Sequence, residues 1–199
     1  PQTMHLPTLE KVGRKHTPDM VYEAFSMARE VGFDNINMDL IAGLPDENLD
    51  SMRYTLEEIK KLSPESITVH SLAIKRAARL NMFKDEYKEL SIENNREIMT
   101  LTAEYAKKMG MDPYYLYRQK NIAGNMENVG YAKEGKEGIY NILIMEEKQT
   151  IVALGAGSIT KVVLPDGRIE RCDNVKDVAL YIEKINEMIE RKKSLFALK

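Results

Sequence analysis

Cysteine is nearly absent from this sequence, since Cys172 is the only one among 199 residues. One cysteine excludes an internal disulfide, and it also excludes a metal site built from several cysteines of this chain alone. The three histidines, His5, His16 and His70, do not have the spacing of metal ligands. We therefore expect no metal bound by this chain by itself.

An excess of one charge and long apolar runs are also missing. The 29 basic and 31 acidic residues give a formal net charge of -2, so no basic field would attract nucleic acid or an anionic membrane. No segment approaches the roughly 20 apolar residues of a membrane span, and the N-terminal residues lack the pattern of a secretory signal. We expect a cytoplasmic protein with neither nucleic acid nor a membrane as partner.

What is present is the composition of an ordinary globular protein, with 43% hydrophobic and 30% charged residues. Thr17 and Pro18 mark the start of a helix that Gly32 ends, and a second helix covers about residues 49–62. Short apolar stretches at 35–45 and 66–72 predict strands. Strands and helices in this order predict βα units in a parallel sheet, open or closed into a barrel.

Two parallel strands are too few for a complete sheet, because they cannot bury both faces or pair both edges. The sequence also starts at Pro1 without a strand or a helix cap leading in. We therefore interpret it as a piece of a longer protein whose missing N-terminal half supplies the other strands. Taken alone, the piece is expected to expose a sheet edge or to pair with another copy of itself.

The pattern changes after residue 82. A charged helix is predicted at 91–109, with Ser91 as its cap and Gly110 at its end. Strands are predicted at 138–145, 150–154, 158–164 and 168–172, with a hairpin turn at 165–167, and an amphipathic helix follows at 175–191. These elements indicate a smaller α+β region with antiparallel strands.

Gln2, Asp39 and Ala73 lie where the predicted ends of the parallel strands meet, the place of active sites in such sheets, and Arg14 lies on the approach to the first helix. An aspartate there can accept hydrogen bonds from ribose hydroxyls, and an arginine can donate two to a carboxylate. The alternatives are that Asp39 caps a helix or a backbone amide, and that Arg14 is a solvated cation.

Four ordered motifs resemble one protein family. Residues 37–45, NMDLIAGLP, are similar to the xxDLIxGLP segment of the coproporphyrinogen dehydrogenase branch of radical S-adenosylmethionine proteins. The opening PQTM and the later VGRKH resemble the VQSF and xxR.H segments of that branch. The stretch from YYLYRQKN to GNMENVGY, and the glycine loop LGAGS at 154–158, resemble its C-terminal region. Together these motifs cover essentially the whole chain.

The resemblance implies an α/β fold. Residues 1–82 would be the C-terminal part of a partial TIM-like βα barrel, and residues 83–199 a family-specific α+β region. It also implies S-adenosylmethionine and a [4Fe-4S] cluster as cofactors of the complete protein. The cluster ligands, in the pattern Cys-x3-Cys-x2-Cys, have no counterpart in this chain and would lie upstream of Pro1.

The same resemblance assigns roles to residues. It places Gln2, Arg14 and Asp39 around S-adenosylmethionine, with Asp39 facing the ribose hydroxyls and Arg14 the methionine part, and it gives Ala73 a backbone contact with adenine.

A second set, Gly155, Gly157 and Ile159, would line a neighbouring substrate or cofactor pocket. The alternative for the two glycines is a tight strand turn. A basic segment at 75–79 is either a solvated loop or a contact for tetrapyrrole propionates.

The implied activity is oxidative decarboxylation of porphyrinogen propionates in haem biosynthesis, with the chain alone inactive. Two other functions stay open at this point. One is a haem-binding chaperone of the same superfamily, and the other is a radical enzyme of this branch that acts on another substrate.

Overall fold

The computed structural model describes residues 1–73, 91–117, 124 and 126–198. Within them the chain divides into two compact units, Pro1–Gly138 and Ile139–Lys199, and each is described by itself. The expected domain boundary after residue 82 falls in the stretch 74–90, outside the described residues, and stays a prediction. None of the described helices is long and apolar enough to cross a membrane.

Four strands form the sheet of the first unit, in the order β1-β2-β4-β3. They are β1 (Asn37–Ala42), β2 (Ser66–Ser71), β3 (Asp112–Tyr117) and β4 (Asn128–Ala132). β1 and β2 are parallel, as predicted, whereas β4 runs antiparallel to both β2 and β3. On the other edge of β1, Gln2 forms a parallel bridge with Leu40.

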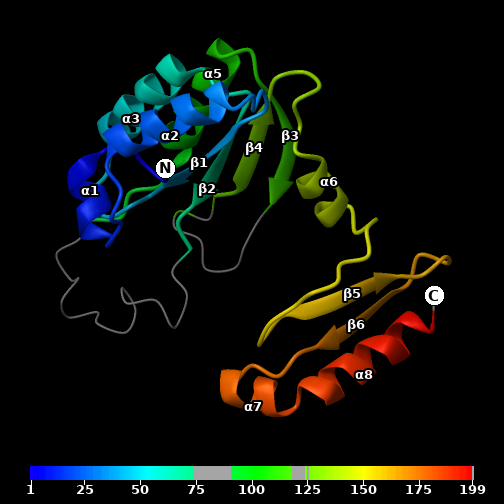
Figure 1. Cartoon of the computed structure of the whole chain (residues 1–199). Helices are drawn as coiled ribbons and strands as arrows, with labels where there is room; N and C mark the ends of the chain where they lie inside the picture. The colour runs from blue at the N-terminus through cyan, green and yellow to red at the C-terminus, as the bar shows by residue number, and fades with distance from the viewer. Residues whose placement is uncertain (74–90, 118–123, 125, 199) are drawn as a thin grey trace. The chain divides into compact units, whose positions relative to one another are not determined.

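The helices of this unit are α1 (Leu6–Lys11), α2 (Pro18–Glu30), α3 (Leu49–Leu62) and α5 (Arg96–Lys108). Figure 1 shows α3 and α5 on one side of the sheet. Thr17 caps α2 as predicted, since its hydroxyl accepts a hydrogen bond from the Met20 amide at 3.3 Å. The predicted limits of the second helix, 49–62, match α3.

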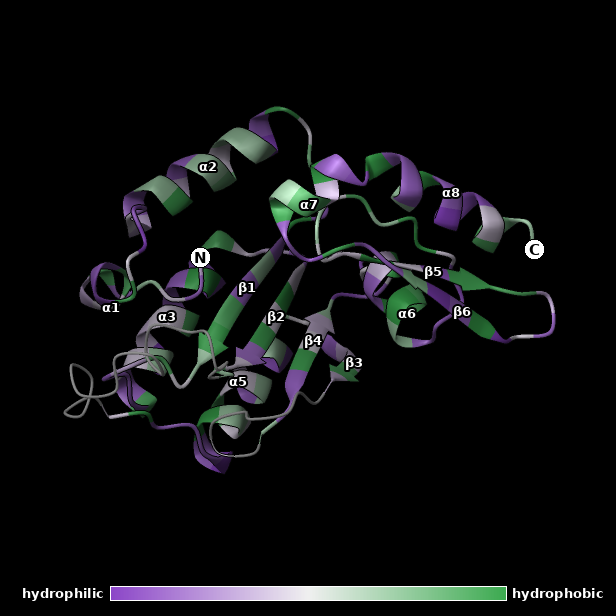
Figure 2. Cartoon of the chain, turned by 90° about the horizontal axis from the view of Figure 1, so that it is seen from below, coloured by the Kyte–Doolittle hydropathy of each residue, from purple (hydrophilic) through white to green (hydrophobic). Residues whose placement is uncertain are grey.

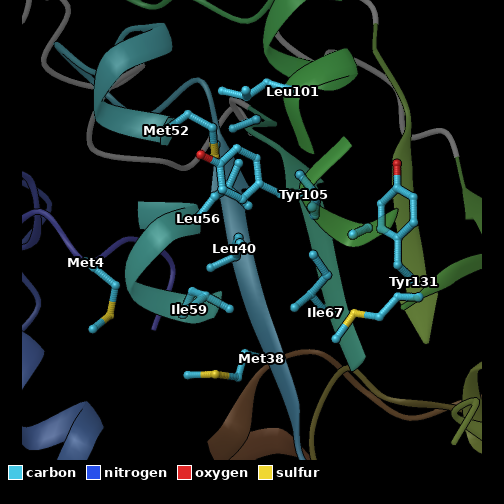
Figure 3. Close-up of a cluster of buried hydrophobic side chains, with 14 of the residues drawn as sticks. Met4, Met38, Leu40, Met52, Leu56, Ile59, Ile67, Leu101, Tyr105 and Tyr131 are labelled. Atoms are coloured by element: carbon cyan, nitrogen blue, oxygen red, sulfur yellow. The ribbon is translucent and has the colours of Figure 1, made fainter. Parts of the chain in front are cut away.

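The core lies between these helices and one face of the sheet. Leu40 and Ile67, on the two parallel strands, and Leu56 and Ile59, on α3, are fully buried and pack in the same cluster (Figure 3). Successive strand residues point to opposite faces, so the side chains that alternate with Leu40 and Ile67 lie on the face away from this core. That second face carries the polar residues described below.

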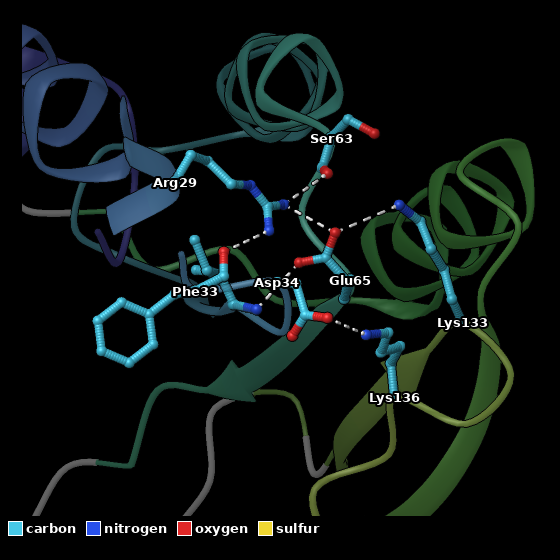
Figure 4. Close-up of polar contacts among 8 residues, drawn as sticks. Arg29, Phe33, Asp34, Ser63, Glu65, Lys133 and Lys136 are labelled. Atoms are coloured by element: carbon cyan, nitrogen blue, oxygen red, sulfur yellow. Dashed lines mark hydrogen bonds and ion pairs between the residues drawn. The ribbon is translucent and has the colours of Figure 1, made fainter. Parts of the chain in front are cut away.

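An ion-pair network closes the end of the unit where α2 finishes and β1 and β2 begin (Figure 4). Glu65 accepts hydrogen bonds from Arg29 at 2.7 Å and from the Ile36 amide at 3.0 Å, and Lys133 lies 3.9 Å away. Arg29 also donates to the carbonyl oxygen of Phe33 at 3.1 Å. One carboxylate therefore connects a helix end, two strand starts and the residue after β4.

The start of the helix predicted at 91–109 is corrected by the structure. The α5 helix begins at Arg96, and its cap is Asn95, which accepts from the Ile98 amide at 3.0 Å. Ser91 pairs instead with Asp46, a residue far away in the sequence: its carbonyl accepts from the Asp46 amide, and its amide donates to the Asp46 carboxylate. Helix α1 and strands β3 and β4 were not among the predicted elements.

The second unit contains a hairpin and three helices. Strands β5 (Ile159–Val163) and β6 (Ile169–Asp173) are antiparallel, which confirms the predicted hairpin. The helices are α6 (Ile139–Met145), α7 (Val178–Glu183) and α8 (Ile185–Phe196), and α8 alternates hydrophilic and hydrophobic residues along its length (Figure 2). The buried cluster consists of Val162, Leu164, Cys172 and Leu195.

Three predictions for this unit were wrong in detail. Residues 138–145, predicted as a strand, form α6, because a short apolar run has no period that separates a strand from a helix. Residues 150–154 supply a single bridge, from Ile151 to Lys161, and no strand. The helix predicted at 175–191 is two helices that meet at Lys184, and the first is capped by Asp177. The fold class, α/β with antiparallel strands in the C-terminal region, is confirmed.

Candidate functional site

Polar side chains gather on the sheet face opposite the helices. Asn37 and Asp39 come from β1, Thr68 and His70 from β2, and Tyr115 from β3. The register places Asp39 beside Thr68, Thr68 beside Gly130 of β4, and Gly130 beside Tyr115. These strands therefore bring polar groups from three distant segments onto one surface, which we call the open face.

Asp39 is the acidic residue of this face. It is the third residue of β1 and lies within the strand, three residues before its end at Ala42. Its side chain is 54% exposed, its Oδ1 accepts a hydrogen bond from Asn37 Nδ2 at 2.7 Å, and Nε2 of His70 lies 3.9 Å from the same oxygen. Among the described residues no hydrogen bond is recorded at Oδ2, so one carboxylate oxygen is held while the other can accept from a ligand.

Gln2 lies beside Asp39 on the edge of the sheet. Its amide donates to the Asp39 carbonyl at 2.9 Å, and its carbonyl accepts from the Ile41 amide at 2.8 Å. The side-chain Oε1 is buried and has no hydrogen-bond partner in the described part of the chain. A buried acceptor without a donor costs about 1–3 kcal/mol, so this oxygen fits a donor group of a bound molecule.

Arg14 lies in the loop before α2. It is exposed, and together with Gln2 and Asn37 it lines a groove of about 580 Å³ along α2 and the start of β1. The Gln2 backbone pairs with that of Asp39, and Asn37 of the same groove holds the Asp39 carboxylate, so the structure brings Gln2, Arg14 and Asp39 to one region.

Ala73 is half-buried, two residues beyond the end of β2. The preceding amide, of Leu72, donates to the Ala42 carbonyl at 2.9 Å, so Ala73 follows directly after the paired ends of β1 and β2. The basic segment at 75–79 lies outside the described residues.

Gly155, Gly157 and Ile159 belong to the second unit. Gly155 and Gly157 have positive φ angles of 98° and 70°, so the loop needs glycine at both positions. The Gly155 amide donates to the Tyr181 hydroxyl at 3.2 Å, its carbonyl accepts from Asn174 Nδ2 at 2.9 Å, and the Gly157 amide donates to the Val175 carbonyl at 2.8 Å. These backbone groups are satisfied within the unit, which agrees with the tight-turn interpretation, and Ile159 is half-exposed at the start of β5.

Three residues of the open face were missed in the sequence: Asn37, Thr68 and Tyr115. For Asn37 and Thr68 a signal exists, because polar and apolar residues alternate in 37–40 and 66–70 and so place the polar ones on one face. For Tyr115 there is no local signal, since its place depends on the pairing of β3 with β4. No group of three or more His, Cys, Asp or Glu among the described residues could hold a metal ion.

Comparison with known proteins gives the family. No family model matches the chain. The oxygen-independent coproporphyrinogen-III oxidase-like protein HemZ of Bacillus subtilis is 45% identical over 193 residues, which cover 96% of this chain and 38% of that protein. The chain belongs to the oxygen-independent coproporphyrinogen III oxidase family.

Two further proteins are similar to this chain at lower sequence identity. The heme chaperone HemW of Bacillus subtilis is 28% identical over 94% of this chain and 45% of its own length. The other is the solved structure of coproporphyrinogen III oxidase (HemN) from Escherichia coli, described as a radical SAM enzyme. It matches 94% of this chain and 42% of its own chain, with a TM-score of 0.68 and 17% sequence identity. At this identity the match shows the fold alone. The chain spans less than half the length of each of these relatives.

Proposed function

We propose that the open face, with Gln2 and Arg14 beside it, binds S-adenosylmethionine in a radical enzyme that oxidatively decarboxylates the propionates of coproporphyrinogen III. The observation that carries this proposal is Asp39, whose Oδ1 is held by Asn37 while Oδ2 is left for a ligand. The buried Oε1 of Gln2, whose backbone amide pairs with Asp39, has no hydrogen-bond partner among the described residues and supports a ligand in this region.

The donor set fits the chemistry of this cofactor. Asp39 accepts hydrogen bonds from the two ribose hydroxyls, and Arg14 donates to the methionine carboxylate. Gln2 accepts from a donor group of the ligand, and the backbone at Ala73 contacts adenine. Gly155, Gly157 and Ile159 remain our proposal for a neighbouring pocket of the complete protein.

When bound, S-adenosylmethionine and a [4Fe-4S] cluster supply the radical chemistry. The residues of this chain bind and orient, and the cluster ligands would come from outside these 199 residues. The remainder of the complete protein and the porphyrinogen substrate are the proposed partners. The chain by itself is proposed to be inactive.

Replacement of Asp39 by alanine in the complete protein tests the site. Two charge-assisted hydrogen bonds are worth about 1.5–3 kcal/mol each, so the loss predicts at least a tenfold weaker affinity for S-adenosylmethionine. The affinity is measured by anaerobic calorimetric titration, beside a thermal melt without ligand. Asp34→Ala, which removes an exposed carboxylate four residues after the end of α2, serves as the control and is expected to bind normally.

The melt separates a binding residue from a structural one. A binding role predicts weaker affinity at an unchanged thermal midpoint. Unchanged affinity with a lowered midpoint would instead make Asp39 a structural cap, and the cofactor site on the open face would be refuted.

The similarity to HemW supports a second candidate, a haem-binding chaperone. Haem titration and porphyrinogen turnover, both on the complete protein, distinguish the two. Stoichiometric haem binding without turnover would favour the chaperone, and turnover without haem binding the enzyme.

A further inference from the structure

A file of polar side chains crosses the open face and ends at Asp39. Burial raises the pKa of Tyr115 on β3, and the nearby Thr68 side chain on β2 opposes this rise. The Thr68 hydroxyl donates to Asn37 Oδ1 at 3.2 Å, and Asn37 Nδ2 donates to Asp39 Oδ1 at 2.7 Å. Thr68, Asn37 and Asp39 are thus linked by hydrogen bonds across the two parallel strands, with Tyr115 of the edge strand near Thr68.

Gly130 makes this file possible. Tyr115 belongs to the edge strand, and its ring must cross β4 to reach Thr68. A Cβ atom on Gly130 would lie 2.0 Å from Cε1 and 2.4 Å from Cδ1 of Tyr115, which real Cβ atoms essentially never do. The ring therefore lies directly over the glycine, and any larger residue at this position would displace it.

The file orients the amide of Asn37. An asparagine side chain carries an acceptor oxygen at one end and a donor NH2 at the other. Because the Thr68 hydroxyl occupies the oxygen, the NH2 group is the end that faces the carboxylate of Asp39. A flipped amide would lose the hydrogen bond to Asp39 and would set its oxygen against the carboxylate, and the Thr68 hydroxyl would have to accept instead of donate.

Asp39 needs such support if it is to bind a ligand tightly. Its side chain is 54% exposed, so without a fixed partner it would sample several rotamers, and ordering it on binding would cost free energy. The charge-assisted bond from Asn37 holds Oδ1 in advance, and His70 Nε2 lies 3.9 Å from the same oxygen on the neighbouring strand.

We propose that Asn37, oriented by Thr68 and Tyr115, is a positioning residue that presets the Asp39 carboxylate for the ribose hydroxyls of the cofactor. The proposal rests on the proposed function, in which Asp39 binds S-adenosylmethionine. Asn37 acts through Asp39 in this arrangement and does not contact the ligand.

A double-mutant cycle in the complete protein tests this, with S-adenosylmethionine affinity measured by calorimetric titration. Asn37→Ala should weaken binding on the order of fivefold, because the carboxylate is then ordered only when the ligand binds. In the Asp39→Ala background the same substitution should have no further effect. Thr68→Val, which keeps the shape and removes the hydroxyl, should give a smaller loss, and this variant serves if Asn37→Ala fails to fold.

Tyr115→Phe extends the test to the far end of the file. Its matched control is Tyr117→Phe, the same change two residues further along β3, because Tyr117 pairs with Asn128 and not with Gly130, the partner of Thr68. We expect weaker binding for the first variant and wild-type binding for the second. Equal effects of both would overturn the part assigned to Tyr115.

The outcomes separate the two proposals. If Asp39→Ala leaves the affinity unchanged, the proposed cofactor site itself is wrong. If Asp39→Ala weakens binding while Asn37→Ala and Thr68→Val do not, the positioning role alone is overturned. Additive losses for Asn37 and Asp39 would also overturn it, because they would show that Asn37 binds the ligand independently.

Discussion

Replacement of Glu65 by alanine should destabilise the protein strongly, because this carboxylate joins several elements at one end of the first unit (Figure 4). The change removes the bond from Arg29 at 2.7 Å and the bond from the Ile36 amide at 3.0 Å. It also removes the opposite charge 3.9 Å from Lys133. The Glu65 side chain is only 12% exposed, so water does not readily replace these contacts.

The magnitude follows from the contacts. Hydrogen bonds to a charged group contribute about 1.5–3 kcal/mol each, and the two bonds together give about 3–6 kcal/mol. The loss of free energy should lie at the lower end of this range, because Arg29 is 31% exposed and keeps its hydrogen bond to the Phe33 carbonyl. We therefore expect a loss of about 3 kcal/mol in the free energy of unfolding, or roughly 6–12 °C in thermal midpoint.

The loss should depend on pH in a defined direction. Burial raises the pKa of Glu65, but the hydrogen bonds from Arg29 and the Ile36 amide and the charges of Arg29 and Lys133 outweigh it, so the pKa lies below its ordinary value. The folded state then binds the proton less tightly than the unfolded state. The charge-dependent stabilisation is fully present above the ordinary value of 4.5 and is lost as the pH falls through the lowered value.

Urea unfolding of the wild type and Glu65→Ala at neutral pH and at pH values below 4.5 measures both effects. Asp34→Ala is the matched control, since Asp34 pairs with Lys136 at 3.2 Å but is 88% exposed, and such pairs contribute about 0–1 kcal/mol. Two results would show that the network does not stabilise this end of the sheet. One is that Glu65→Ala lowers the free energy of unfolding no more than Asp34→Ala does. The other is that Glu65→Ala lowers it by the same amount at acid and at neutral pH.

Two further stability predictions follow from single residues. Burial raises the pKa of Glu47 despite hydrogen bonds from Thr3 and Thr8, so the free energy of unfolding should fall as the pH rises above the ordinary pKa of a glutamate. Glu47→Gln keeps an acceptor for Thr3. Its thermal midpoint should be higher than that of the wild type at neutral pH and equal to it near pH 4. Ser63 follows the end of α3 with a φ of 54°, a conformation that glycine adopts more easily. Ser63→Gly should therefore raise the free energy of unfolding in urea by about 0.5 kcal/mol. A less stable variant would show that the serine side chain contributes a contact there.

Elements with local signals were predictable from the sequence. The α2 helix has Thr17 as cap and Pro18 at its first position, and both signals act through neighbouring residues. The α5 helix shows where this stops, because Ser91 is as good a cap as Asn95 by residue type. The choice between them is made by the pairing of Ser91 with Asp46, a contact that no local pattern contains.

The candidate site was predictable only in part for the same reason. Gln2, Arg14 and Asp39 were identified by resemblance, and the structure brings them to one region. Their roles toward the cofactor stay predictions. The positions of Ala73, after β2, and of Gly155, before β5, follow from their order in the sequence. The two residues lie in different units, and what each binds is likewise a prediction.

The polar alternation in β1 and β2 carries more information than the sequence analysis took from it. Strands of a parallel sheet covered by helices on both faces are apolar nearly throughout. Here Asn37, Asp39, Thr68 and His70 share one face, while their neighbours along each strand are buried against α3 and α5. Polar side chains would lose hydrogen bonds to water if a helix covered this face, so the alternation predicts a face that no helix covers. It places Asn37 on that face on the same grounds as Asp39.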